Sequence, residues 1–317
     1  MPKLQNALME GSPIHGTNFF IDIALRIIAK GAFGSGFSTT EECEALRDAY
    51  SVVWSEMERQ VSGNAPEATS ERMELFYEGL RYFSDTAKRI AGQRREGDPD
   101  HASFIDYLLA EKSDQHIADE VITFLVGGFH TSGNLLNWAS YYLAKHPNEQ
   151  LKIQEELDYI DDPDVLNLDS IEMMPKMRNM LDETLRLSVL APWGARVNYR
   201  GPTELPGGYV VEKGVPILTP FGVLLRDPNL WENVDAFNPD RFNNPDNKTL
   251  KFSPFGFAGG RSCPGQNMAY YETTIILGTI LKQYSLSLAP NHPEVGRVHG
   301  LVTKTSQDIM LNVSRRN

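Results

Sequence analysis

A glycine-rich stretch near the C-terminus, FGFAGGRSCPG over residues 255–265, places Cys263 two residues after Arg261 and directly before a predicted helix. Because a helix N-terminus favours a bound anion, a thiolate is stabilised at such a position. Gly259 and Gly265 let the backbone approach a bulky partner and turn sharply. This stretch alone leaves three interpretations of Cys263 open: a packed loop cysteine, a reactive thiol, and a thiolate that holds heme iron.

The rest of the chain disfavours a zinc site, a disulfide framework and nucleic-acid binding. Cys43 is the only other cysteine, which is too few for a framework and indicates a reducing compartment. His292 and His299 are poorly spaced to complete a tetrahedral zinc site. The formal net charge of −12 at pH 7 disfavours nucleic acid, because a phosphate-binding surface needs clustered Lys and Arg.

The composition predicts a folded domain without a segment that spans a bilayer. The chain has 317 residues, of which 41% are hydrophobic and 23% charged, and it is long enough to bury a large core. It contains no run of about 18 apolar residues, so we expect no transmembrane segment. The first residues lack the apolar block of a signal peptide. From the sequence we expect a soluble or peripheral protein.

Apolar residues at helical spacing predict most of the elements that must position Cys263. The longest predicted helix covers about 114–146, and its roughly 32 residues would span about 48 Å across the domain. Alternating residues between Gly and Pro turns over 195–220 predict short antiparallel strands. Other helices are expected at 18–34, 38–61, 70–95, 148–160, about 173–188 and 266–284, before a short β tail. We therefore predict one domain over 1–317, mainly α with small antiparallel β-sheets (α+β).

Three further motifs precede the cysteine loop, which we place at 252–265. GGFHTS, over 127–132 of the long helix, contains paired glycines that each cost about 1 kcal/mol relative to Ala. These glycines make sense if a flat ligand or oxygen must lie against the backbone. Glu183 and Arg186 in ETLR are three residues apart, so their side chains can meet on one helix face. FNPDRF supplies Arg241, a guanidinium that can bridge two partners.

The order of these motifs resembles the cytochrome P-450 superfamily. The cysteine loop matches the GxRxCxG part of the superfamily's FxxGxRxCxG pattern, ETLR matches ExxR, FNPDRF matches PxRF, and GGFHTS is similar to [AG]Gx[DE]T. Among branches, GVLLRDPNLW, FNPDRF and FGFAGG are most similar to animal family 20. The resemblance covers nearly the whole chain and implies the superfamily's fold without its N-terminal portion, because the match begins only around Asn18.

The resemblance also implies a cofactor and a role for each matched residue. Heme b would be held with Cys263 as the axial ligand of the iron. Other heme contacts are implied for Arg261, Arg196, Gly259, Gly265 and Phe257. Thr131, helped by His130, would orient dioxygen and deliver protons, while Glu183, Arg186 and Arg241 would support the proximal side.

Two positions depart from the superfamily's pattern. His130 stands where the superfamily usually has an acid, and a histidine relays protons only near its own pKa. Gly256 stands seven residues before Cys263, where an aromatic residue is usual. Phe255 and Phe257 flank this glycine, and either is available to shield the sulfur.

The function implied by the resemblance is a heme-thiolate monooxygenase. It would insert one atom of dioxygen into an apolar small molecule such as a lipid, sterol or xenobiotic. Electrons would come from an NADPH-dependent reductase, since no flavin or nicotinamide site is recognisable in this chain. The resemblance implies the endoplasmic reticulum membrane, although a chain without an anchor could be cytoplasmic. Two alternatives remain: a heme-thiolate isomerase or dehydratase, and a shortened, heme-poor protein that binds ligands or partners.

Overall fold

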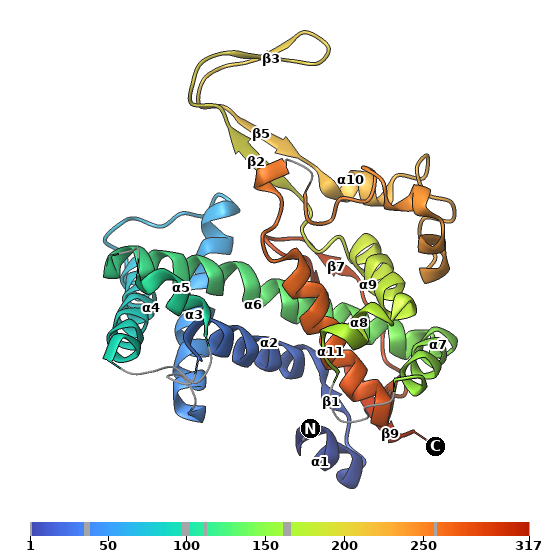
Figure 1. Ribbon diagram of the computed structural model, residues 1–317. Helices are drawn as coiled ribbons and strands as arrows, with labels where there is room; N and C mark the ends of the chain where they lie inside the picture. The colour runs from blue at the N-terminus through green and yellow to red at the C-terminus, as the bar shows by residue number, and fades with distance from the viewer. Residues whose placement is uncertain are drawn as a thin grey trace. The chain divides into compact units, whose positions relative to one another are not determined.

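The computed structural model describes residues 2–34, 39–96, 102–110, 113–160, 166–256 and 259–316. The chain forms two compact units (Figure 1), one of His15–Asn137 and one of Met1–Ile14 with Trp138–Asn317. The single domain over 1–317 stays a prediction.

The unit of His15–Asn137 consists mainly of helices in its described part. Its helices are α2 (Gly16–Phe33), α3 (Thr40–Val61), α4 (Glu71–Glu96), α5 (Phe104–Leu109) and most of α6 (Asp114–Lys145). A capping box starts α3, because the Glu42 N–H donates to the Thr39 hydroxyl at 3.1 Å and the Thr39 N–H donates to the Glu42 carboxylate at 3.2 Å. The 32 residues of α6 confirm the long helix expected from the sequence.

The core of this unit consists of the apolar faces of α2, α3, α4 and α6. Fully buried side chains include Phe20, Leu25, Ile28, Leu46, Tyr50, Phe83 and Phe129. Gly128 of α6 has a packing reason to lack a side chain, because a Cβ there would lie 2.7 Å from Cδ1 of Ile28. The helix face at Gly128 therefore packs directly on α2.

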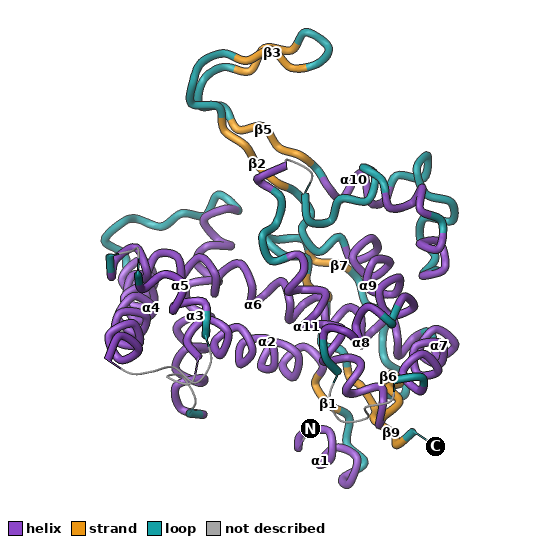
Figure 2. Tube along the Cα trace, in the orientation of Figure 1, coloured by secondary structure: helices purple, strands orange, loops and turns teal. Residues whose placement is uncertain are grey.

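The second unit combines helices with short antiparallel strands (Figure 2). Its α-helices are α1 (Pro2–Glu10), the end of α6, α7 (Pro147–Asp158), α8 (Leu168–Glu172), α9 (Pro175–Ser188), α10 (Phe221–Arg226) and α11 (Gln266–Gln283). Its 3-10 helices are η2 (Pro239–Asn243), η3 (Pro245–Lys248) and η4 (Gly259–Arg261). Its strands are β2 (Gly194–Val197), β3 (Thr203–Leu205), β4 (Tyr209–Val211), β5 (Pro216–Thr219), β6 (Tyr284–Leu288), β7 (Arg297–Val298), β8 (Lys304–Thr305) and β9 (Met310–Arg315). The short strand β1 (Ile14–His15) has one residue in each unit's range.

The strand pairs β2–β5, β3–β4, β6–β9 and β7–β8 of this unit are antiparallel. The region predicted as strands folds into two of them, β2 with β5 in the register Gly194↔Thr219, and β3 with β4 in the register Thr203↔Val211. The β3–β4 hairpin continues outward from the β2–β5 ribbon (Figure 1). The tail forms β6 with β9 and β7 with β8. The fold class, mainly α with small antiparallel sheets, is confirmed.

The short helices α1, α5, α8 and α10 were not expected from the sequence. Each has nine residues or fewer, which is too short for apolar periodicity to stand out. In the longer helix α9, every residue from 179 to 188 is buried. In the described part of the chain, no helix combines the length and apolarity that crossing a bilayer requires.

Candidate functional site

Glu183, Arg186 and Arg241 meet in a buried cluster of charges. The Arg186 guanidinium donates to both carboxylate oxygens of Glu183, at 2.7 and 3.0 Å. Nε of Arg241 lies 3.0 and 3.1 Å from the same two oxygens. The side chains of Glu183 and Arg186 are 0% exposed, and that of Arg241 is 7% exposed. The structure therefore brings together the three side chains that were expected, from the sequence, to support the proximal side of the heme.

This cluster ties α9 to the chain that follows α10. Two positive charges face one carboxylate, and backbone carbonyls accept the remaining guanidinium N–H groups. Arg186 donates to the carbonyls of Leu225 and Val234 at 3.2 and 2.9 Å, and Arg241 donates to that of Glu232 at 2.9 Å. The Asn238 N–H completes the arrangement by donating to Glu183 at 2.9 Å. The irregular segment over 225–238 is thus held by side chains rather than by regular secondary structure.

Cys263 lies at the surface of its unit, just before α11. Its side chain is exposed, and its N–H donates to the carbonyl of Phe255 at 2.9 Å. Between these residues, Gly256 and Gly259 adopt φ values of 83° and 53°, in the left-handed region that glycine tolerates best. Gly265 directly precedes the first residue of α11. The loop therefore presents a thiol at a helix start, as the sequence predicted.

The side chains around Cys263 fit an anionic, metal-containing macrocycle. A Cβ added at Gly259 or Gly260 would meet nothing within 4 Å, so the loop leaves open space beside it. Arg261 is exposed, and Nη2 of the exposed Arg196 donates to the Arg261 carbonyl at 3.2 Å. A soft thiolate with two guanidiniums nearby suits an iron porphyrin that carries carboxylates. Phe257 lies outside the described residues.

Thr131 of α6 bonds back to its own helix. Its hydroxyl donates to the Gly127 carbonyl at 2.7 Å and lies 3.3 Å from that of Gly128. A Cβ at Gly127 would meet nothing within 4 Å, whereas the one at Gly128 would clash with α2. The two adjacent glycines therefore serve different purposes: Gly128 allows helix packing, and Gly127 leaves its helix face open. Thr131 belongs to one unit and Cys263 to the other.

His130 lies in an aromatic cluster that the sequence did not predict. Its ring centroid is 4.3 Å from that of Trp54 and 5.2 Å from that of Tyr50, both on α3. The Tyr50 hydroxyl donates to the Val126 carbonyl of α6 at 3.3 Å. These contacts give the His130 ring a packing role between α3 and α6. Its part in proton delivery stays a prediction.

Replacing His130 with alanine should destabilise the fold more than replacing it with phenylalanine. His130→Ala removes the ring from the cluster and should lower the free energy of unfolding by about 2 kcal/mol. His130→Phe keeps an aromatic ring there and should lower it by no more than about 1 kcal/mol. Urea unfolding of the three proteins measures the difference. Equal stability of both variants and the unchanged protein would contradict the packing role.

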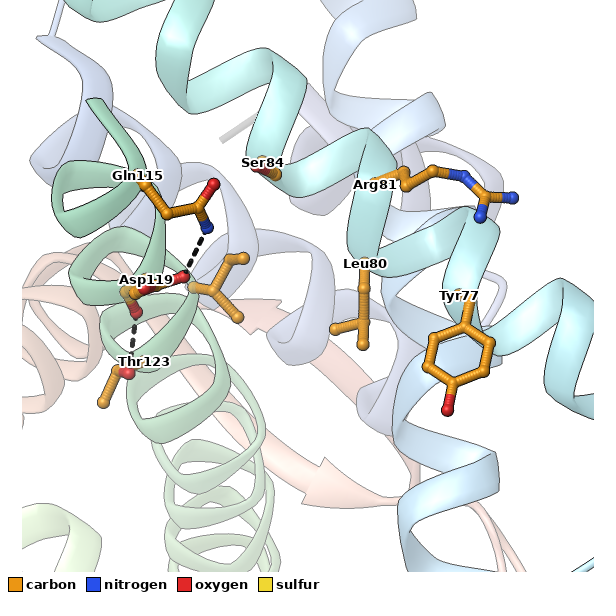
Figure 3. A pocket seen from close by; sticks show the side chains of 8 residues that line it. Tyr77, Leu80, Arg81, Ser84, Gln115, Asp119 and Thr123 are labelled. Carbon is orange, nitrogen blue, oxygen red and sulfur yellow. Dashed lines mark hydrogen bonds between the residues drawn. The ribbon is translucent and has the colours of Figure 1, made fainter. Parts of the chain in front are cut away.

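An open depression of about 530 Å³ lies between α4 and the first turns of α6 (Figure 3). Within it, the Gln115 amide donates to the Asp119 carboxylate at 2.9 Å, and the Thr123 hydroxyl donates to the Asp119 carbonyl at 2.8 Å. Its lining residues are Tyr77, Leu80, Arg81, Ser84, Gln115, Asp119, Ile122 and Thr123. None of them is a site residue predicted from the sequence, so this depression takes no part in the candidate site.

The sequence reasoning missed two residues beside the cysteine loop. Asp182 directly precedes Glu183 and is 1% exposed, and the Tyr270 hydroxyl donates to it at 2.6 Å. In the sequence, nothing distinguishes Asp182 from other helix residues beside the ETLR motif. A carboxylate in the buried half of an amphipathic helix is the signal that could have identified it.

Comparison with known proteins agrees with this fold. The family model described as "Cytochrome P450" matches residues 3–313. The chain belongs to the cytochrome P450 family. Members of this family use heme b as their cofactor.

The relatives extend the likeness to several branches. Cytochrome P450 20A1 of Rattus norvegicus is 27% identical over 94% of this chain and 64% of its own length, which confirms the expected similarity to family 20. Protein LUTEIN DEFICIENT 5, chloroplastic, of Arabidopsis thaliana is 26% identical over 99% of this chain and 57% of its own. Bifunctional cytochrome P450/NADPH–P450 reductase 2 of Bacillus subtilis is 36% identical over 55% of this chain and 16% of its own. The chain thus spans less than two thirds of the length of the relatives it matches.

Proposed function

We propose that this chain is the heme-bearing part of a monooxygenase that acts on a small apolar molecule. The observation that carries the proposal is the exposed Cys263 thiol at the start of α11, in a loop with room beside its glycines. Family membership supplies the expectation of heme b. Bound heme would supply an iron that activates dioxygen. The chain's own residues would hold this cofactor and manage protons.

Each site residue has a distinct part in this proposal. Cys263 would hold the iron through its thiolate, and the guanidiniums of Arg196 and Arg261 would pair with the heme carboxylates. Glu183, Arg186 and Arg241 would act only as support, since their charged groups are buried against one another and the backbone. Gly259 and Gly265 would allow close approach of the macrocycle.

Thr131 would handle protons in this proposal. Its Oγ1 donates to the Gly127 carbonyl and so keeps its lone pairs free to accept a hydrogen bond from water or substrate oxygen. His130, one residue earlier, would assist proton supply through its ring nitrogens.

Replacing Thr131 with alanine should uncouple electron use from product formation. The hydroxyl is already satisfied within the helix, so its loss should change the free energy of unfolding by less than about 1 kcal/mol. Loss of a positioned proton-handling group should lower product per electron by about tenfold or more. Product yield against NADPH consumed measures this ratio, and Thr131→Ser, which keeps a hydroxyl, is the control. Unchanged yield in Thr131→Ala would remove Thr131 from proton delivery.

The proposed function is tested by the absorption spectrum of the heme-reconstituted chain, reduced and bound to carbon monoxide. A Soret band at the position diagnostic of thiolate ligation supports it, and absence of any heme spectrum favours the heme-poor alternative. An NADPH-dependent reductase as electron donor is part of the proposal, as is the endoplasmic reticulum membrane as location. Turnover of an oxygenated lipid without reductase would instead identify an isomerase or dehydratase.

A further inference from the structure

Asp182 is a buried carboxylate whose partners come from three segments of the chain. The Tyr270 hydroxyl on α11 donates to Oδ1 at 2.6 Å. Nε of Arg178, one turn earlier on α9, lies 3.2 Å from the same oxygen. Nζ of Lys248, at the end of η3, lies 3.7 Å from Oδ2. Because a buried carboxylate is costly unless it is paired, these contacts offset the burial of Asp182, which is 1% exposed.

The partners of Asp182 bracket the loop that carries Cys263. Lys248 precedes this loop, and Tyr270 follows it in the second turn of α11. Both ends of the loop therefore converge on one carboxylate of α9. The Tyr270 contact is the shorter and more buried of the two, since Tyr270 is 3% exposed and the Lys248 side chain is 42% exposed. Tyr270 is accordingly the main attachment.

The ring of Tyr270 continues the connection towards Cys263. The Arg178 guanidinium lies over this ring, 3.5 Å from its centroid. The Phe255 ring packs against it at a centroid distance of 5.3 Å. The carbonyl of Phe255 in turn accepts the Cys263 N–H at 2.9 Å. A continuous series of contacts thus runs from Asp182 to the backbone of the sulfur-bearing residue.

The hydroxyl of Tyr270 stays protonated, and therefore a donor, at neutral pH. Burial, reinforced by the negative charge of Asp182, raises the pKa of Tyr270 well above its ordinary value of 10.0. The hydrogen bond has a charged acceptor, which makes it stronger than a bond between neutral groups. This contact therefore holds α11 firmly on α9.

Successive residues on α9 serve two different parts of the site. Neighbouring side chains on a helix point about 100° apart, so Asp182 and Glu183 face different segments. Glu183 holds the chain over 225–241 through Arg186 and Arg241, while Asp182 holds α11 and the loop before it. Glu183 and its neighbour Asp182 thus hold different segments of the chain.

We propose that Tyr270, through its hydrogen bond to Asp182, is a positioning residue that fixes the Cys263 loop for ligation of heme iron. The proposal rests on the proposed function, because it assigns the loop's rigidity to iron binding. The loop between Lys248 and α11 contains glycines at 256, 259, 260 and 265, so its backbone needs an external restraint. The Asp182–Tyr270 contact supplies that restraint.

The test compares Tyr270→Phe with Tyr271→Phe in the full chain. Tyr270→Phe keeps the ring against Arg178 and Phe255 but removes the hydroxyl. Tyr271 is the next residue on α11 and is 38% exposed, so Tyr271→Phe makes the same chemical change at the surface. Hydrogen exchange of the Cys263 amide, measured without heme, should be about tenfold faster in Tyr270→Phe than in the unchanged protein. Tyr271→Phe should exchange at the unchanged rate.

A second readout uses the heme-loaded protein. Tyr270→Phe should retain heme but convert part of the thiolate band of the carbon monoxide complex to a band without thiolate ligation, and Tyr271→Phe should not. Equal exchange of the Cys263 amide in the two variants would overturn the proposal. A uniform rise in exchange over all of α9 and α11 would also overturn it, by assigning Tyr270 to general stability. If the unchanged protein lacks a thiolate band, the proposed function fails, while the exchange comparison still decides whether Tyr270 restrains the loop.

Discussion

Replacing Cys263 with serine should abolish the thiolate band of the reduced carbon monoxide complex. Serine differs from cysteine by one atom, and an alcohol does not replace a thiolate as a ligand that donates electron density to iron. The Cys263 side chain is exposed, and the contact that shapes the loop is made by its backbone N–H, which serine keeps. The free energy of unfolding should therefore change by less than about 0.5 kcal/mol. Loss of the band together with an unchanged fold would assign the iron ligand.

The matched control is Cys43→Ser, the same change at the other cysteine of the chain. Cys43 is buried on α3, so a serine there should cost about 1–3 kcal/mol of stability through its buried hydroxyl. The thiolate band should nevertheless persist. A band that survives in Cys263→Ser, or that disappears in Cys43→Ser while the protein stays folded, would contradict the assignment of Cys263.

Replacing Glu183 with glutamine should produce the largest loss of stability among the changes considered. The substitution keeps the size of the side chain but removes the only negative charge that Arg186 and Arg241 share. Two guanidiniums then remain buried without a counterion, which costs about 3–5 kcal/mol. One oxygen of the carboxylate also becomes an NH₂ group that faces N–H donors. Urea or thermal unfolding would measure the loss.

Glu294→Gln is the control for this change. Glu294 forms an ion pair with Lys145 at 2.5 Å, but its side chain is 81% exposed, so the same substitution should cost at most about 1 kcal/mol. Faster hydrogen exchange over 225–238 should accompany Glu183→Gln, because the segment loses the side chain that organises its carbonyls. Equal stability of the two variants would show that the buried cluster does not hold this segment.

The two carboxylates of α9 explain how one short helix can serve a site that extends over many segments. Glu183 acts on the chain after α10, and Asp182 acts on α11. Hydrogen exchange should therefore become faster in different places. It should rise over 225–238 in Glu183→Gln, and around Cys263 in Tyr270→Phe, which removes the hydroxyl that donates to Asp182. Under the proposed function, neither side chain has to touch the cofactor, because both would act through the segments that they hold.

The sequence by itself determined the features that depend on neighbouring residues. The start of α3 follows from Thr39 and Glu42, which cap each other across three residues. The turns between β2 and β5 follow from glycines and prolines, and the length of α6 follows from uninterrupted periodicity before Pro147. The order of the motifs was enough to identify the family, since each motif is local.

Only the tertiary structure decided which distant side chains meet. Packing against α3 places His130 beside Tyr50 and Trp54. Packing against α2 leaves no room for a side chain at Gly128. Tyr270 reaches Asp182 across 88 positions of sequence. Such contacts follow from how buried surfaces fit together, and periodicity says which face of a helix is buried without saying what covers it. The loop that contains Cys263 is thus a local feature of this chain, whereas the contacts that hold it are a property of the folded unit.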